Sequence, residues 1–187
     1  LNEERKELTA QATNNAIAQI EEMKALEKPV LVIYLKDCHE SVAGIVAGRI
    51  REKYYRPAYV LTDGEKGLKG SGRSIPGYHM QQALQNCQEI LTEFGGHALA
   101  AGFSLPKENL DKFRDALNEQ CNLTDEELVE KISFDMELEL LEATKNLVEQ
   151  LHYMEPFGES NDSAIFARGK LKIKSMYLCG KENQIAK

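Results

Sequence analysis

The sequence has no long apolar run and no paired cysteines. None of its hydrophobic stretches approaches the ~20 residues that a membrane-spanning helix requires. Its first 28 residues are charged and lack the apolar segment of a signal peptide. The four cysteines show no CxxC spacing; they are Cys38, Cys87, Cys121 and Cys179. These absences argue against a membrane protein, a zinc site and a disulfide framework, and they predict a cytoplasmic protein with reduced thiols.

Catalytic motifs are missing as well. The sequence contains no HExxH, no GxSxG and no GxxxxGK(S/T) segment. Its histidines are far apart, and none has a carboxylate at ligand spacing on a shared helix face. We therefore predict that this chain holds no metal, no cofactor and no catalytic residue of its own, although a lone nucleophilic cysteine remains an alternative to buried structural thiols.

Charge is unevenly distributed along the chain. The formal net charge of −7 argues against a general nucleic-acid coat. Residues 45–104 nevertheless carry seven lysines and arginines against five acids, a local charge of +2, so the remainder carries −9. A basic face on an acidic body is compatible with a single groove for a polyanion.

Hydrophobic periodicity predicts an α/β domain in the first two thirds of the chain. Helices are expected over 3–26, 40–54, 79–91 and 106–120, and strands over 30–35, 57–62, 68–75 and 94–105. The first helix has its apolar residues at spacings of three and four; they are Leu8, Ala12, Ala16, Ile20 and Met23. In the second helix, Gly44 and Gly48 cost stability, so close packing of the backbone against another element is expected there.

The character of the sequence changes after Cys121. Residues 122–127 are acidic and predict a linker, and a strand over 132–138 and a helix over 140–151 are expected to follow. Beyond a loop at 155–161, apolar residues near 165–166 and alternating from Leu171 predict one or two strands of an unfinished β unit. Because the chain lacks an initiator methionine and ends in strand-like sequence, we expect it to be a piece of a longer protein.

Two glycine-rich segments, each built around one polar side chain, carry the functional signal. They are Gly70–Ser74 (GSGRS) and Gly95–Phe103 (GGHALAAGF). Arginine offers a planar fork of donors for phosphate oxygens, and an exposed glycine backbone adds N–H donors. The two segments together predict an anion site. The alternative is a pair of tight turns with a salt-bridged arginine and a hydrogen-bonded histidine.

A phosphate site built from these segments needs specific side chains. In the first, Arg73 and two hydroxyls on a glycine-flexed strand could grip a backbone phosphate. In the second, His97 and the neighbouring N–H groups could contact the same phosphate or another one. The candidate nucleic-acid-binding residues are Ser71, Gly72, Arg73, Ser74, Gly95, Gly96, His97 and His39. For His39, which directly precedes a predicted helix, the alternative is a histidine that only closes a strand end.

These segments resemble, in order, motifs of the RecJ single-stranded-DNA exonucleases. The three stretches are Cys38–Ile50 (CHESVAGIVAGRI), Gly70–Ile75 (GSGRSI) and Gly95–Gly102 (GGHALAAG). In that family they belong to the DHH-associated domain, which follows the catalytic DHH domain. The Glu155–Gly158 loop resembles the segment that begins the family's OB-fold, and Leu1-Asn2 with Arg5 resembles the end of the DHH domain. Cys38 and Ser41 depart from the usual pattern, where many relatives have an aromatic residue and glycine.

The resemblance implies a fold, a domain division and an activity. The implied fold is α/β, a DHH-associated domain with a mixed β-sheet flanked by helices. The implied division is a connecting helix over 1–27, the α/β domain over 28–122, and a linker with a partial OB-fold over 123–187. The activity is a 5′→3′ exonuclease for single-stranded DNA in recombination and repair. Its manganese or magnesium is held by the DHH domain, which is absent here, so this chain alone is expected to be inactive. Ser71, Arg73 and His97 would contact the DNA backbone across the interdomain cleft, and a single-strand-binding protein or a helicase is an implied partner of the full-length protein.

Two other functions remain open. The first is a DHH-family phosphoesterase that acts on short oligonucleotides or cyclic dinucleotides, which the loop at 155–158 and the strands after it disfavour. The second is a non-catalytic relative that scaffolds a replication complex. A scaffold has no need for a phosphate grip, so the presence of both Arg73 and His97 weighs against it.

Overall fold

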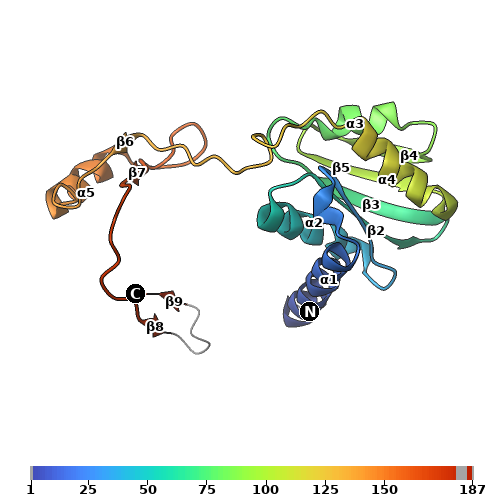
Figure 1. Ribbon diagram of the computed structural model, residues 1–187, viewed down its shortest axis with the longest axis horizontal. Coiled ribbons are helices and arrows are strands. Elements are labelled where there is room, and N and C mark those ends of the chain that lie inside the picture. The colour runs from blue at the N-terminus through green and yellow to red at the C-terminus, as the bar shows by residue number, and fades with distance from the viewer. Residues whose placement is uncertain (1, 180–184, 187) are drawn as a thin grey trace. The chain divides into compact units, whose positions relative to one another are not determined.

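The chain folds into two compact units, residues 1–130 and 131–187, in a computed structural model (Figure 1). The structure describes residues 2–179, 185 and 186. Leu1, which carries part of the resemblance to a DHH domain end, and the end of the predicted partial OB-fold at 180–184 and 187 lie outside the described residues.

The first unit is a five-stranded mixed sheet with helices on both faces, as the sequence predicts. Its elements are α1 (Asn2–Glu22), β1 (Leu31–Tyr34), α2 (Glu40–Tyr54), β2 (Ala58–Gly64), β3 (Gly67–Arg73), α3 (Met80–Asn86), β4 (Glu93–Gly96), β5 (Ala100–Leu105) and α4 (Leu110–Glu119). The strand order is β1-β2-β3-β5-β4. β1 and β2 run parallel, and the other pairs are antiparallel.

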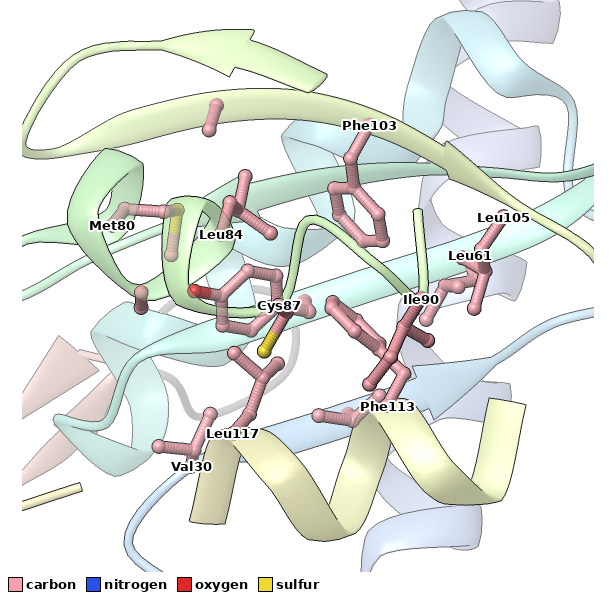
Figure 2. Close-up of a cluster of buried hydrophobic side chains, with 14 of the residues drawn as sticks. Val30, Leu61, Met80, Leu84, Cys87, Ile90, Phe103, Leu105, Phe113 and Leu117 are labelled. Carbon is pink, nitrogen blue, oxygen red and sulfur yellow. The ribbon is translucent and has the colours of Figure 1, made fainter. Parts of the chain in front are cut away.

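One face of the sheet packs against α3 and α4 around three aromatic rings (Figure 2). The Phe103 and Phe113 ring centroids lie 5.0 Å apart, and Tyr59 meets Phe103 edge to face at 5.6 Å. Such edge-to-face geometry is favourable for aromatic pairs beyond the area that they bury. Successive residues of a strand point to opposite faces. Tyr59 and Leu61 therefore enter this core, while Val60 of the same strand enters the other one.

The opposite face packs against α1 and α2. Ala12, Ala16 and Ile20 of α1 are buried in this second core. Leu8 and Met23, predicted for the same helix face, remain about half exposed, because α1 extends beyond the sheet at its N-terminal end and stops at Glu22 before Met23 can pack. The helix is thus a packed part of the first unit.

α2 covers only part of its face of the sheet. On β5, Ala101, Phe103 and Leu105 point into the first core, whereas Gly102 and Ser104 point to the α2 side and stay exposed or half-buried. The β4–β5 edge of the sheet is therefore open on the α2 side. This open face is where the candidate site lies.

The second unit has very little regular structure. It contains the short strands β6 (Met136–Glu137), β7 (Phe166–Ala167), β8 (Leu178–Cys179) and β9 (Ile185–Ala186) and the helix α5 (Lys145–Leu151). Pairing is parallel for β6–β7 and antiparallel for β8–β9. The predicted strand over 132–138 is reduced to two residues, the helix begins later than expected, and Leu171 lies in no strand.

The physical reason is the lack of a core in this unit. None of the described side chains between 131 and 179 is buried. A pair of strands is marginal without further strands or a covering layer, so alternating sequence alone does not produce longer strands here. Among the described residues, no helix is both long and apolar enough to cross a membrane.

Candidate nucleic-acid interface

Strand register lines up the polar residues of β3 on the open face. Arg73 pairs with Ala100, Ser71 with Gly102, and Lys69 with Ser104. Because side chains alternate along a strand, Lys69, Ser71 and Arg73 all point to the α2 side of the sheet. Lys69 is absent from the residues predicted from sequence. Its place two residues before Ser71 in a predicted strand was the available signal, because residues two apart in a strand point to the same face.

A groove of about 540 Å³, the Lys69–Ser71 groove, lies over the first two residues of this row, and Arg73 follows two residues beyond Ser71 on the same face of β3. Its floor is formed by residues 69–71 of β3 and 102–104 of β5, and its wall by residues 39–41 at the start of α2 and Ala43. Serine hydroxyls and exposed backbone dominate the surface at Ser41, Ser71 and Ser104, which suits the many acceptor oxygens of a phosphodiester.

Arg73 lies against α2 and has no acidic partner among the described residues. Its Nη1 donates to the carbonyl of Gly72 at 2.8 Å. The alternative of a salt-bridged arginine is therefore wrong. The guanidinium keeps an uncompensated positive charge and most of its donors, which is what an anion site requires.

Glycine in α2 makes room for this guanidinium. A Cβ atom at Gly44 would lie 3.0 Å from Nη2 of Arg73 and 3.6 Å from Cβ of Ser71. The predicted close approach is thus confirmed for Gly44. It is wrong for Gly48, where a Cβ would meet nothing within 4 Å.

This difference gives a matched pair of variants. Gly44→Ala is expected to displace the Arg73 side chain and to weaken binding of a single-stranded oligonucleotide severalfold. Gly48→Ala likewise replaces a glycine inside the helix, where glycine lowers stability. It is therefore expected to raise the free energy of unfolding by about 0.5–1 kcal/mol and to leave Arg73 in place. Fluorescence anisotropy and thermal unfolding of both variants measure the two effects. Equal affinities for the two variants would contradict a positioning role for Gly44.

Ser74 is held in the interior, unlike Ser71. It is 2% exposed, and its hydroxyl donates to the carbonyl of Tyr78 at 2.6 Å. Its backbone N–H donates to the carbonyl of Leu99 at 2.9 Å. Ser74 therefore links β3 to the β4–β5 hairpin, and its hydroxyl does not reach the groove.

The second glycine segment is a β-hairpin, where the sequence predicted one extended stretch. Gly96 has φ +150°, and a Cβ there would lie 2.4 Å from the Ala100 carbonyl oxygen, so only glycine fits. The His97 N–H closes the hairpin on Ala100 at 2.8 Å. The alternative interpretation of these segments as tight turns is therefore confirmed at Gly96. Gly95 is exposed on β4, and nothing lies within 4 Å of its Cβ position.

The hairpin places His97 near the Arg73 end of the open face. Its side chain is exposed and makes no hydrogen bond to any described residue, so the alternative of a buried, hydrogen-bonded histidine is wrong. β5 separates β4 from β3, and neighbouring strands lie about 4.8 Å apart, so the His97 and Arg73 backbones are about 10 Å apart. That separation is compatible with contacts to one strand of nucleic acid.

His39 is the N-cap of α2, at the opposite end of the groove. Its Nδ1 accepts from the N–H of Ser41 at 3.2 Å and lies 2.8 Å from the Ser41 hydroxyl. An N-cap acceptor satisfies one of the free donors of a helix start. The side chain remains exposed at the groove wall, so capping and ligand contact both remain available to it.

An ion pair borders the same end of the groove. The Lys69 Nζ and a Glu40 carboxylate oxygen lie 2.9 Å apart. The hydrogen bond from Lys69 lowers the pKa of the Glu40 carboxyl, and the hydrogen bond to Glu40 raises the pKa of Lys69. Both groups stay charged near neutral pH and largely neutralise each other, so Arg73 is the one cation in the row Lys69, Ser71 and Arg73 that has no acidic partner among the described residues.

The cysteines show no sign of nucleophilic use. All four are free. Burial raises the pKa of the Cys38, Cys87 and Cys121 thiols, which keeps them protonated and poorly reactive. Within the described part of the chain, no three histidine, cysteine or acidic side chains come together as metal ligands.

The fold and the groove together define an α/β domain with an open sheet face that carries an arginine without an acidic partner among the described residues and, at the hairpin, an exposed histidine. Comparison with known families agrees: residues 27–123 match the DHHA1 domain family, and residues 134–187 match the RecJ OB domain family. The chain belongs to the DHHA1 family, in the form that RecJ exonucleases carry beside an OB domain.

Relatives of known name support the same assignment. The chain is 35% identical over 165 residues to the single-stranded-DNA-specific exonuclease RecJ of Bacillus subtilis, covering 86% of this chain and 21% of the relative. It is 30% identical over 193 residues to RecJ of Escherichia coli, covering 98% and 33%. RecJ from Thermus thermophilus, solved in complex with Mn2+, aligns with a TM-score of 0.76 at 26% identity over 88% of this chain and 24% of that structure. The chain thus spans about a fifth to a third of the length of these relatives.

Proposed function

We propose that this chain is the DNA-holding part of a RecJ-type exonuclease, which degrades single-stranded DNA from the 5′ end in recombination and repair. The observation that carries the proposal is Arg73, a cation with no acidic partner among the described residues, which lies on the open face of a DHHA1-type domain two residues beyond the Ser71 that lines the groove. The matches to RecJ proteins and to the RecJ OB domain family support the choice of single-stranded DNA as ligand.

The groove residues act by positioning and by neutralising charge. The Arg73 guanidinium donates to the oxygens of one backbone phosphate, and the Ser71 hydroxyl donates to the same group. His97 donates to a phosphate further along the strand. When the phosphodiester is held in a fixed position, the binding free energy offsets part of the entropic cost of reaching the transition state for hydrolysis. Donors aimed at the phosphate also stabilise the negative charge of the transition state.

The hydrolytic step itself belongs to another part of the protein. Two of the related structures hold Mn2+ and Mg2+, and a divalent metal supplies the attacking hydroxide in such hydrolyses. The described residues of this chain offer no such ligand set. We therefore assign the metal to a DHH domain upstream. We also propose that the chain divides into three parts, at residues 27 and 122, and that the protein is cytoplasmic.

The direct test is binding without cleavage. The purified chain is expected to bind a single-stranded oligonucleotide weakly and to lose affinity as salt rises, with a slope of log K against log salt of roughly −0.7 for each neutralised phosphate. With Mn2+ or Mg2+ added, it is expected to leave the oligonucleotide intact. Anisotropy titrations and a gel assay measure both. Metal-dependent degradation by a highly purified sample would overturn the assignment of catalysis to another domain.

The phosphoesterase alternative predicts a different ligand preference. An enzyme for cyclic dinucleotides or very short oligonucleotides would bind these at least as well as a longer strand. The match of the second unit to the RecJ OB domain family favours the exonuclease, since that unit adds single-strand-binding surface. Competition of a cyclic dinucleotide against a longer oligonucleotide distinguishes the two functions.

A further inference from the structure

A second groove, of about 470 Å³, lies on the other side of the α2 N-terminus, between α1 and residues 34–39. It adjoins the Lys69–Ser71 groove, because His39 lines both. A ligand held at one groove can therefore extend past His39 into the other. No candidate residue from the sequence other than His39 falls in this second groove.

One wall of this groove carries side-chain amides. Gln11, Asn15 and Gln19 follow one another at spacings of four, so they lie on one face of α1. The Gln19 amide is held by the backbone of Tyr34, because it donates to the carbonyl and accepts from the N–H of that residue at 3.0 and 3.1 Å. The amides of Gln11 and Asn15 make no hydrogen bond to any described residue.

Part of the remaining lining is apolar, with Leu8, Leu35 and Val42 in it, and Lys36 and Asp37 add one charge of each sign. Apolar side chains beside unpaired amides suit a flat ligand with apolar faces and a hydrogen-bonding edge. A nucleobase has this character. An amide offers a donor and an acceptor in one plane, which is the pattern that asparagine and glutamine use on base edges.

We propose that the groove formed by Gln11, Asn15 and the 34–39 segment receives the base of a nucleotide whose phosphate lies in the Lys69–Ser71 groove. This inference rests on the proposed function. A side-chain amide can present its oxygen or its nitrogen to the ligand, so any of the four bases finds a partner. The groove therefore distinguishes a strand with bases from one without, and it does not select a sequence.

The test uses the whole 187-residue chain and two short oligonucleotides of equal length, one of thymidines and one with abasic sites. Their phosphates are the same, so the ratio of their affinities reports base contacts. The unchanged chain is expected to bind the abasic strand about three- to tenfold more weakly, the size of one or two hydrogen bonds. The double variant Gln11→Ala/Asn15→Ala is expected to bind both strands with the affinity that the unchanged chain has for the abasic strand.

Asn14→Ala is the matched control, because Asn14 is an exposed amide on the same helix outside the groove. It is expected to leave the ratio unchanged. Side-chain amide NMR signals of Gln11 and Asn15, but not of Asn14, are expected to shift on addition of thymidine 5′-monophosphate. Equal binding of the two strands by the unchanged chain, or equal losses in the Asn14 and double variants, would overturn the base groove. Arg73→Ala tests the phosphate grip separately, because it lowers affinity for both strands alike.

Discussion

Replacing Arg73 with alanine is expected to lower kcat/KM for single-stranded DNA by about 10- to 100-fold in a protein that joins this chain to its DHH domain. Loss of a hydrogen bond to a charged group costs about 1.5–3 kcal/mol, and each 1.4 kcal/mol is a factor of ten. Among the described residues, the guanidinium has no hydrogen-bond partner other than the Gly72 carbonyl, so the fold loses little when it is removed. Exonuclease rates at several substrate concentrations measure the effect.

Two further variants set the scale for this result. Lys66→Ala removes one positive charge from the exposed turn between β2 and β3, outside the groove, and is expected to leave the rate unchanged. His97→Ala is expected to reduce the rate less than Arg73→Ala, since a neutral imidazole donates one hydrogen bond. If the Arg73 and His97 variants both kept the full rate, the groove would have no part in holding the DNA.

Replacing Gly70 with alanine is expected to destabilise the first unit by about 1–3 kcal/mol or more, the usual cost of overpacking a core. The added Cβ would lie 2.2 Å from Cζ of Phe103. That ring cannot move aside easily, because it packs against Phe113 and Tyr59. Urea or thermal unfolding monitored by circular dichroism measures the loss.

Gly102→Ala is the control for this prediction. Gly102 pairs with Ser71 on the neighbouring strand but faces the open side, where the nearest atom to an added Cβ is 4.0 Å away. It is expected to leave stability within about 0.5 kcal/mol of the parent. The double variant Gly70→Ala/Phe103→Leu is expected to recover part of the loss because leucine is smaller. Equal stability of the Gly70 and Gly102 variants would show that the glycine has no packing role.

Local periodicity was sufficient for most elements of the first unit. The helix over 40–54 has the predicted bounds because its apolar spacing, its N-cap and the following proline agree. α3 is shorter than predicted, ending at Asn86, because the chain then turns so that Cys87 and Ile90 can enter the core. In the second unit, alternation alone did not predict strand length, since the strands there have no core to cover.

The amino-acid sequence by itself determined the α/β class, the order of elements and the residue types of the candidate site, because these depend on the spacing of neighbouring residues. Only the tertiary structure decided what each residue of the glycine segments does. Gly70 makes room for the core, Gly96 forms a hairpin, the Ser74 hydroxyl bonds to Tyr78, and Arg73 lies on the open face against α2. The physical reason is that these roles depend on strand register and on which helix covers which face, and both are set by contacts between residues far apart in the chain.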